Sequence, residues 1–182
     1  MKKIMMTLAA AVCSLAAMAS TYTGQLSVSI NGVGGLQDGV AINMDQNEDG
    51  TYNFSLKDFV FYLEGEPMPV GNIELNNLSA TEGAQFKNVS FTGGINILPG
   101  STEQFPNEED WVGPMLEEVP LVLNAAFNNM AISVHIDIEM EVLGQTIKVD
   151  FIAAAKQGDV NLDNEIGIAD VTSLVNIVLD QE

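Results

Sequence analysis

The sequence predicts a mainly β protein built as an antiparallel barrel or sandwich. Between Thr21 and about Lys156, apolar residues recur at every second position in short runs. Clusters of Gly, Pro and Asn separate these runs, which gives about eight to ten strands at short spacing. No long amphipathic helical pattern interrupts them. This combination is typical of antiparallel barrels and sandwiches, and a hydrophobic content of 47% argues against a disordered chain.

Residues 1–19 have the features of a secretory signal peptide. Lys2 and Lys3 lead into an apolar run, and Ala17-Met18-Ala19 offers the small residues that signal peptidase requires. The run holds about 14 apolar residues, fewer than the roughly 20 that span a bilayer, which disfavours a membrane anchor. We therefore expect cleavage near Ala19 and a secreted, periplasmic or cell-surface location in a bacterium.

The sole cysteine, Cys13, lies inside this segment. It allows an alternative, a lipoprotein anchored through Cys13, although Val12 is bulky where a lipoprotein peptidase prefers a small residue. If Cys13 leaves with the signal, the mature chain has no thiol and no disulfide. Its stability must then come from core packing, helped by calcium.

The chain is strongly acidic. Six lysines stand against 25 Asp and Glu residues, a formal charge of −19, and removal of Lys2 and Lys3 leaves four lysines and a charge of −21. Nucleic acids and anionic lipid head groups bind clustered Lys and Arg, so we expect no nucleic-acid partner. The same charge favours cations.

The first strands follow from alternation. Apolar residues alternate with polar ones over residues 22–30, and Tyr52, Phe54 and Leu56 repeat the pattern after the turn Asp49-Gly50. Shorter candidates follow at residues 73–75, 86–91 and 95–98. A hairpin is expected from residues 132–142 and 147–151, joined at Gly144-Gln145. His135, the sole histidine, lies on the polar face of that hairpin and is expected to point to solvent.

One long connection, residues 100–120, breaks the alternating pattern and carries the only tryptophan, Trp111. Loops of this length are often lids or binding loops. The alternative is that Trp111 plugs one end of the barrel, because large aromatic side chains are usually packed.

The C-terminal segment places oxygen-bearing residues at the spacing of a calcium loop. Asp159, Asn161 and Asp163 occupy positions one, three and five, and Asp170 occupies position twelve. Glu165 would add its backbone carbonyl at position seven, so that six to eight oxygens can surround one Ca²⁺ ion. Position six is Asn164 where glycine is usual, and asparagine tolerates a left-handed backbone better than most residues.

A helical stripe follows the loop. Val171, Leu174, Val175, Val178 and Leu179 fall at the spacing of one helix face. This stripe needs a partner surface.

Together, Gly158-Asp159-Val160-Asn161-Leu162-Asp163 and Ile168-Ala169-Asp170-Val171-Thr172-Ser173-Leu174-Val175 resemble the first repeat of a type I dockerin. Dockerins of cellulosomes carry two such repeats and bind cohesin modules, whereas one repeat is found here. The resemblance therefore implies calcium binding more strongly than it implies a cohesin-type partner.

A second acidic segment, residues 45–50, matches the first six positions of a calcium loop even better. Its twelfth position is Leu56, and the alternation after Gly50 indicates a strand. We interpret this segment as a hairpin turn.

Catalytic signals are weak. The glycines of residues 32–35 lack the following helix that a phosphate-binding loop requires, and no nucleophile and base stand in a recognisable context. We therefore expect no enzyme. Paired carboxylates for glycoside hydrolysis remain open, because distance in space is invisible in a sequence.

The β region also resembles a family. The carrying segments are Tyr22-Thr23-Gly24 with Leu26-Ser27-Val28, Tyr52-Asn53-Phe54-Ser55-Leu56-Lys57-Asp58-Phe59, Pro69-Val70-Gly71-Asn72-Ile73, Trp111-Val112-Gly113-Pro114 and Ile136-Asp137-Ile138. They look like the calycin-like domains of secreted proteins from gut-dwelling anaerobic bacteria. The resemblance implies a lipocalin-related, eight-stranded antiparallel barrel, and barrels of this size either fill with side chains or hold one small apolar ligand.

These expectations combine into three parts: a signal peptide over residues 1–19, a calycin-like barrel over 20–156 and a dockerin-like calcium module, a loop plus one helix, over 157–182. The primary functional hypothesis is a secreted, non-catalytic binding protein. An alternative is an assembly module that docks onto another secreted or surface protein through the C-terminal helix. A third hypothesis, a carbohydrate-active enzyme, rests only on the company that dockerins keep.

Overall fold

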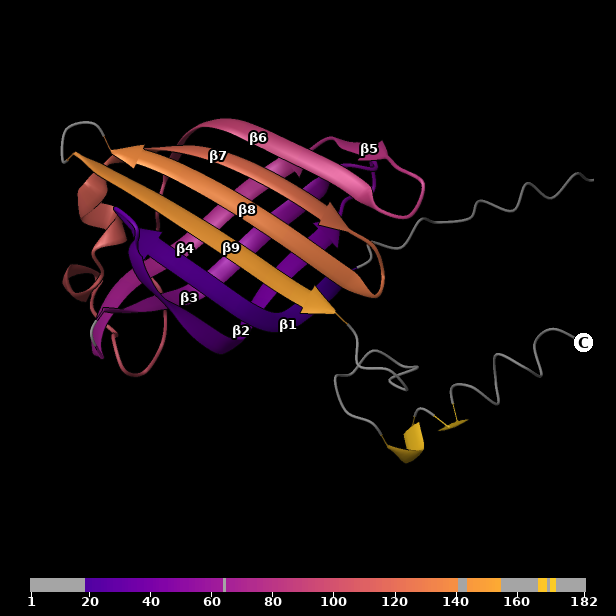
Figure 1. The fold of residues 1–182 in the computed structure, drawn as a ribbon, viewed down its shortest axis with the longest axis horizontal. Coiled ribbons are helices and arrows are strands. Elements are labelled where there is room, and N and C mark those ends of the chain that lie inside the picture. Colours follow the sequence, from indigo (N-terminus) through magenta and orange to yellow (C-terminus); the bar gives the residue numbers. More distant parts are fainter. Residues whose placement is uncertain (1–18, 64, 141–143, 155–166, 170, 173–182) are drawn as a thin grey trace, which may run out of the picture.

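The computed structural model describes residues 19–63, 65–140, 144–154, 167–169 and 171–172 (Figure 1). Within these residues, two short 3-10 helices, η1 (Glu108–Asp110) and η2 (Gly113–Leu116), lie between the sixth and seventh strands. The strands are β1 (Ala19–Ile30), β2 (Val33–Gln46), β3 (Tyr52–Leu63), β4 (Glu66–Leu78), β5 (Ala80–Glu82), β6 (Lys87–Asn96), β7 (Glu118–Phe127), β8 (Ala131–Met140) and β9 (Gln145–Ala154). Among the described residues, the structure contains no helix with the length and apolar character needed to span a membrane.

The strands form one curled antiparallel sheet in the order β4-β3-β2-β1-β9-β8-β7-β6-β5 (Figure 1). The mainly β, antiparallel prediction is confirmed, but the described sheet has nine strands rather than eight. The additional strand arises where β4 ends. Leu78 makes the last pairing with β3, and residues 80–82 then pair with β6 at the opposite edge of the sheet.

Alternation along the strands separates a packed interior from a wet exterior. In β7, for example, Val119, Leu121, Leu123, Ala125 and Phe127 are buried and the residues between them are more exposed. The buried side chains of all the longer strands form a single cluster. Each fully buried Leu, Ile or Phe contributes about 1.5–3 kcal/mol relative to exposure, so this cluster is the main source of stability. Of the two expected interiors, the structure has the one filled with side chains.

The hairpin is confirmed for residues 132–140 and 147–151, which belong to β8 and β9, and the strands that include residues 22–30 and 52–56 are confirmed as β1 and β3. Gln145, expected in the turn, is the first residue of β9 and pairs with Met140. The two strands expected at residues 86–91 and 95–98 are wrong as separate elements, because residues 87–96 form the single strand β6. Gly93 and Gly94 do not break it, since they pair with Leu121 and Pro120 of β7. Pro120, expected in the long connection, is therefore part of β7.

One end of the barrel is closed by bonds between its two edges. Asn72 of β4 and Leu98, just after β6, exchange backbone hydrogen bonds of 2.7 and 3.1 Å. The Asn72 side chain adds two contacts, accepting from the backbone N–H of Asp58 and donating to the Pro99 carbonyl. Close by, η2 lies against β4 and β6, and the Val112 N–H donates to the Pro69 carbonyl. We call these contacts the seam.

Trp111 is buried at this closed end, with no exposed surface. Its indole N–H donates to the Phe105 carbonyl at 2.7 Å, and the two rings meet edge to face at 5.7 Å between centroids. Gly100 leaves the space that the indole ring occupies. Trp111 is therefore packed at one end of the barrel, which confirms the second of the two interpretations.

Only five residues of the C-terminal segment are described. Ile168, Ala169, Val171 and Thr172 have helical backbone, and the Thr172 hydroxyl donates to the Ile168 carbonyl at 3.1 Å. The expected calcium ligands Asp159, Asn161, Asp163, Glu165 and Asp170 lie outside the described residues, as do residues 1–18 with Cys13.

Candidate functional site

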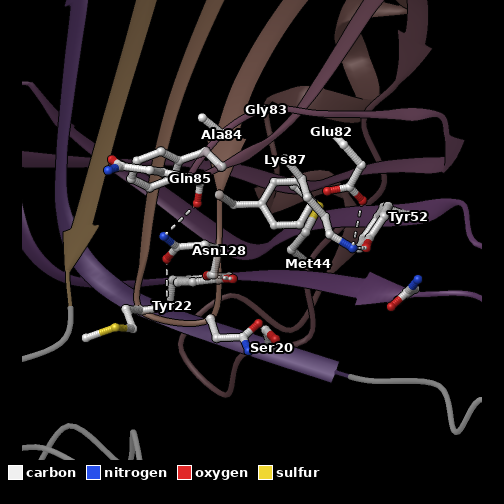
Figure 2. Close-up of a pocket in the computed structure, with 15 residues that line it drawn as sticks. Ser20, Tyr22, Met44, Tyr52, Glu82, Gly83, Ala84, Gln85, Lys87 and Asn128 are labelled. Carbon is white, nitrogen blue, oxygen red and sulfur yellow. Dashed lines mark hydrogen bonds and ion pairs between the residues drawn. The ribbon is translucent and has the colours of Figure 1, made fainter.

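A pocket of about 630 Å³ lies at the end of the barrel opposite the seam (Figure 2). Five segments supply its walls: the first residues of β1, the last of β2, the first of β3, the turn from β5 to β6 and the turn from β7 to β8. The lining residues are Ser20, Tyr22, Met44, Gln46, Tyr52, Glu82, Gly83, Ala84, Gln85, Phe86, Lys87, Phe127, Asn128, Asn129 and Met130. We call it the mouth pocket.

Its floor is the end of the hydrophobic core. Tyr22, Met44, Tyr52 and Phe127 are inward-facing residues near strand ends, and all four belong to the core cluster. Tyr52 and Phe127 pack edge to face with 4.9 Å between ring centroids. Because the strands end here, these side chains have core neighbours below them and the pocket above them. The floor of the pocket is therefore largely aromatic, and each of these side chains exposes less than a tenth of its surface.

Asn128 braces one wall. Its backbone carbonyl accepts a hydrogen bond of 2.6 Å from the Tyr22 hydroxyl, and its side-chain amide donates to the Gln85 carbonyl in the turn from β5 to β6 (Figure 2). Its side-chain oxygen accepts hydrogen bonds from the backbone N–H groups of Met130 and Ala131. Burial raises the pKa of the Tyr22 hydroxyl above its ordinary value, so Tyr22 is neutral at physiological pH. The two turns are thus tied together across the pocket.

Lys87 supplies a positive charge to the pocket, beside Phe127, its partner on the adjacent strand. Its ammonium donates to the Tyr52 hydroxyl at 2.8 Å, lies 5.4 Å from the centroid of the Tyr52 ring and pairs with Glu82 at 3.3 Å (Figure 2). The hydrogen bond to Tyr52 is the main cause that raises the pKa of Lys87, and Glu82 adds to it. Lys87 is therefore fully charged at physiological pH.

The five expected calcium ligands lie outside the described residues, and within the described ranges no group of three or more His, Cys, Asp or Glu residues could hold a metal ion. The interpretation of residues 45–50 as a turn is confirmed, because β2 ends at Gln46, β3 begins at Tyr52 and Asn47 bonds Thr51 across the turn.

His135 lies on the outer face of β8, as expected, with 41% of its side chain exposed. It also has partners that alternation did not predict. Its ring nitrogens contact Asp150 of β9 at 2.6 Å and Asp137 at 3.0 Å. The hydrogen bond with Asp150 is the main cause that raises the pKa of His135 above its ordinary value.

Sequence reasoning missed the mouth pocket. Tyr22 and Tyr52 were assigned to strands, but Lys87, Glu82 and Asn128 were not singled out. Lys87 and Tyr52 are 35 positions apart, and Asn128 and Tyr22 are 106 apart, so only pairing across the barrel brings them together. A tyrosine at the start of each of two strands was the available signal.

A small antiparallel barrel with a packed interior and a partly aromatic pocket at one end is consistent with ligand binding. Residues 18–154 match the family described as Calycin-like beta-barrel domain, and the chain belongs to that family. No curated protein and no solved structure matches the chain. Several segments that carried the resemblance, among them residues 69–73 and 111–114, meet at the seam, so they specify closure of the barrel rather than the pocket.

Proposed function

We propose that this protein is a non-catalytic binding protein that holds one small ligand with an apolar body in the mouth pocket. The observation that carries the proposal is the aromatic floor of Tyr22, Tyr52 and Phe127 beneath a pocket of about 630 Å³. Ligand pockets are commonly about 300–1,000 Å³ and mostly apolar, with a few polar groups that orient the ligand. The aromatic rings of the mouth pocket are suited to packing against the apolar body of a ligand, and its polar side chains are suited to hydrogen bonding.

A neutral fluorescent probe, N-phenyl-1-naphthylamine, tests this proposal. We expect its fluorescence to rise on binding the wild-type protein. Ala84→Trp should weaken the binding at least tenfold, because Ala84 lines the pocket and an indole ring at this position would occupy the pocket. Ser90→Trp is the matched control, since Ser90 is an exposed residue of β6 that does not line the mouth pocket. Equal binding by all three proteins would contradict the proposal.

The proposal extends to where the protein works and to a bound cation. We infer that the protein is exported, on the strength of Lys2, Lys3, the apolar run and Ala17-Met18-Ala19.

We also infer that residues 159–170 bind one Ca²⁺ ion through Asp159, Asn161, Asp163, the Glu165 carbonyl and Asp170, as the dockerin-like spacing supports. Calorimetric titration with calcium should show one site in the mature protein. Asp159→Ala and Asp170→Ala should abolish it, and identical heats from all three proteins would contradict the inference.

A second candidate function is docking through the C-terminal segment. Ile168 and Val171 are 86% and 60% exposed, which leaves apolar surface available to another protein. Secreted extract should yield a calcium-dependent partner with the mature chain and none with a chain that ends at Lys156. The same proteins recovered by both chains would contradict this function.

A further inference from the structure

Lys87 and Tyr52 place two hydrogen-bond donors side by side at the mouth pocket. The Tyr52 hydroxyl oxygen accepts a hydrogen bond from the Lys87 ammonium, so the hydrogen of that hydroxyl points away from Lys87. An ammonium has three N–H groups. The described partners of Lys87 are Tyr52 and Glu82, and they take two of these groups. Two donors beside a positive charge match the two oxygens of a carboxylate.

Glu82 is the partner that an incoming anion would replace. Its side chain is 74% exposed and lies 3.3 Å from the Lys87 ammonium, and solvent-exposed ion pairs of this kind are weak. Asn128, next to Phe127, already has partners, since its side-chain amide donates to the Gln85 carbonyl and its own carbonyl accepts from the Tyr22 hydroxyl. The polar end of a ligand therefore has its best partners at Lys87 and Tyr52, with the ring of Phe127 packed next to Tyr52.

We propose that the mouth pocket selects amphipathic anions. A carboxylate head group binds between the Lys87 ammonium and the Tyr52 hydroxyl and displaces Glu82, and an apolar chain or ring lies on the aromatic floor. This inference rests on the proposed ligand pocket. It adds the chemical class of the ligand and names Lys87 as the residue that determines specificity.

Competition against N-phenyl-1-naphthylamine tests the inference. Decanoate and 1-decanol have the same chain and differ in the charge of the head group. Their displacement constants are measured at about 0.15 M ionic strength, where charges more than about 8 Å apart are largely screened. The ratio of the displacement constant of 1-decanol to that of decanoate measures the preference for the anion. This ratio should fall about tenfold in Lys87→Met. It should be unchanged in Lys148→Met, because Lys148 lies on the outer face of β9.

A gain of affinity separates this prediction from a folding defect. Glu82→Gln removes the competing carboxylate, so decanoate should bind two- to threefold more tightly to this variant than to the wild type. An unchanged ratio in Lys87→Met, or stronger displacement by decyltrimethylammonium than by decanoate, would overturn the inference and leave the ligand pocket intact. Failure of the neutral probe to bind the wild type would instead overturn the proposed function.

Discussion

His135 illustrates how a single residue acquires its properties from neighbouring strands. On β8 it shares a face with Asp137, and pairing with β9 places Asp150 directly opposite. Both ring nitrogens therefore meet carboxylates, and Lys148 lies opposite Asp137 as the next charge along the ladder. The imidazolium form can donate to both partners, which is why the folded state favours protonation.

We predict that His135 titrates above its ordinary pKa of about 6.5 in the folded protein. The stabilisation from the protonated ring is then complete below about pH 6.5 and is lost as the pH rises through the folded-state pKa. Because His135 is the sole histidine, its ring protons give an isolated NMR titration.

In that titration, Asp150→Asn should lower the pKa of His135 more than Asp137→Asn does, since the bond with Asp150 is the larger cause. A wild-type value at or below about 6.5 would show that the two contacts do not persist in solution.

At the scale of elements, the seam determines whether the curled sheet closes. Asn72 connects β4 to Leu98 through its backbone and to Asp58 and Pro99 through its side chain. The adjacent Gly71 has φ of +121°, a backbone conformation that L side chains rarely adopt. A Cβ atom there would collide with the Leu98 carbonyl oxygen, so the close approach of the two edges requires glycine.

We expect Gly71→Ala to lower the free energy of unfolding by roughly 2–3 kcal/mol, because the strained backbone and the clash with Leu98 act together. Denaturant unfolding measures this change. Gly35→Ala is a matched control on β2, where the nearest atom to a Cβ is 4.0 Å away and φ is ordinary. A loss that is no larger for Gly71→Ala than for Gly35→Ala would show that the seam does not need this glycine.

At the scale of the whole molecule, the described core is contained in one part of the chain. Every member of the main cluster lies between Tyr22 and Ala153, within the family match of residues 18–154. The last strand is essential to it, because Phe151 is fully buried and β9 joins β8 to β1. The barrel therefore has the core of an independent domain.

We predict that a chain of residues 20–156 unfolds cooperatively, with a stability within about 1 kcal/mol of a chain of residues 20–182 in calcium-free buffer. A chain that ends at Val149 is the control and should lose at least about 3 kcal/mol or fail to fold, since it lacks Phe151 and Ala153. Circular dichroism during urea unfolding measures all three proteins. A deficit above about 2 kcal/mol for residues 20–156 would assign the C-terminal segment a structural role in the barrel.

Much of the fold was predictable because alternation is a local signal. The buried faces of β1, β3, β8 and β9 follow directly from apolar residues at every second position. β2 was harder to predict, because its first half is largely exposed and includes Gly34, Gly35 and Gly39, so only Ile42 and Met44 mark a buried face. The number of strands also depended on a long-range event, the transfer of residues 80–82 to the opposite edge of the sheet.

The sequence by itself determined the class of fold, the acidic charge and the spacing of the Asp and Asn residues in 159–170, because each of these depends on composition or on neighbours along the chain. The tertiary structure alone decided where the barrel closes, that its interior is filled, and that Trp111 is packed at the seam. It also decided that Lys87, Tyr52 and Phe127 meet at the mouth pocket. Lys87 of β6 and Phe127 of β7 are direct partners on adjacent strands, whereas Tyr52 of β3 meets them only because the sheet curls.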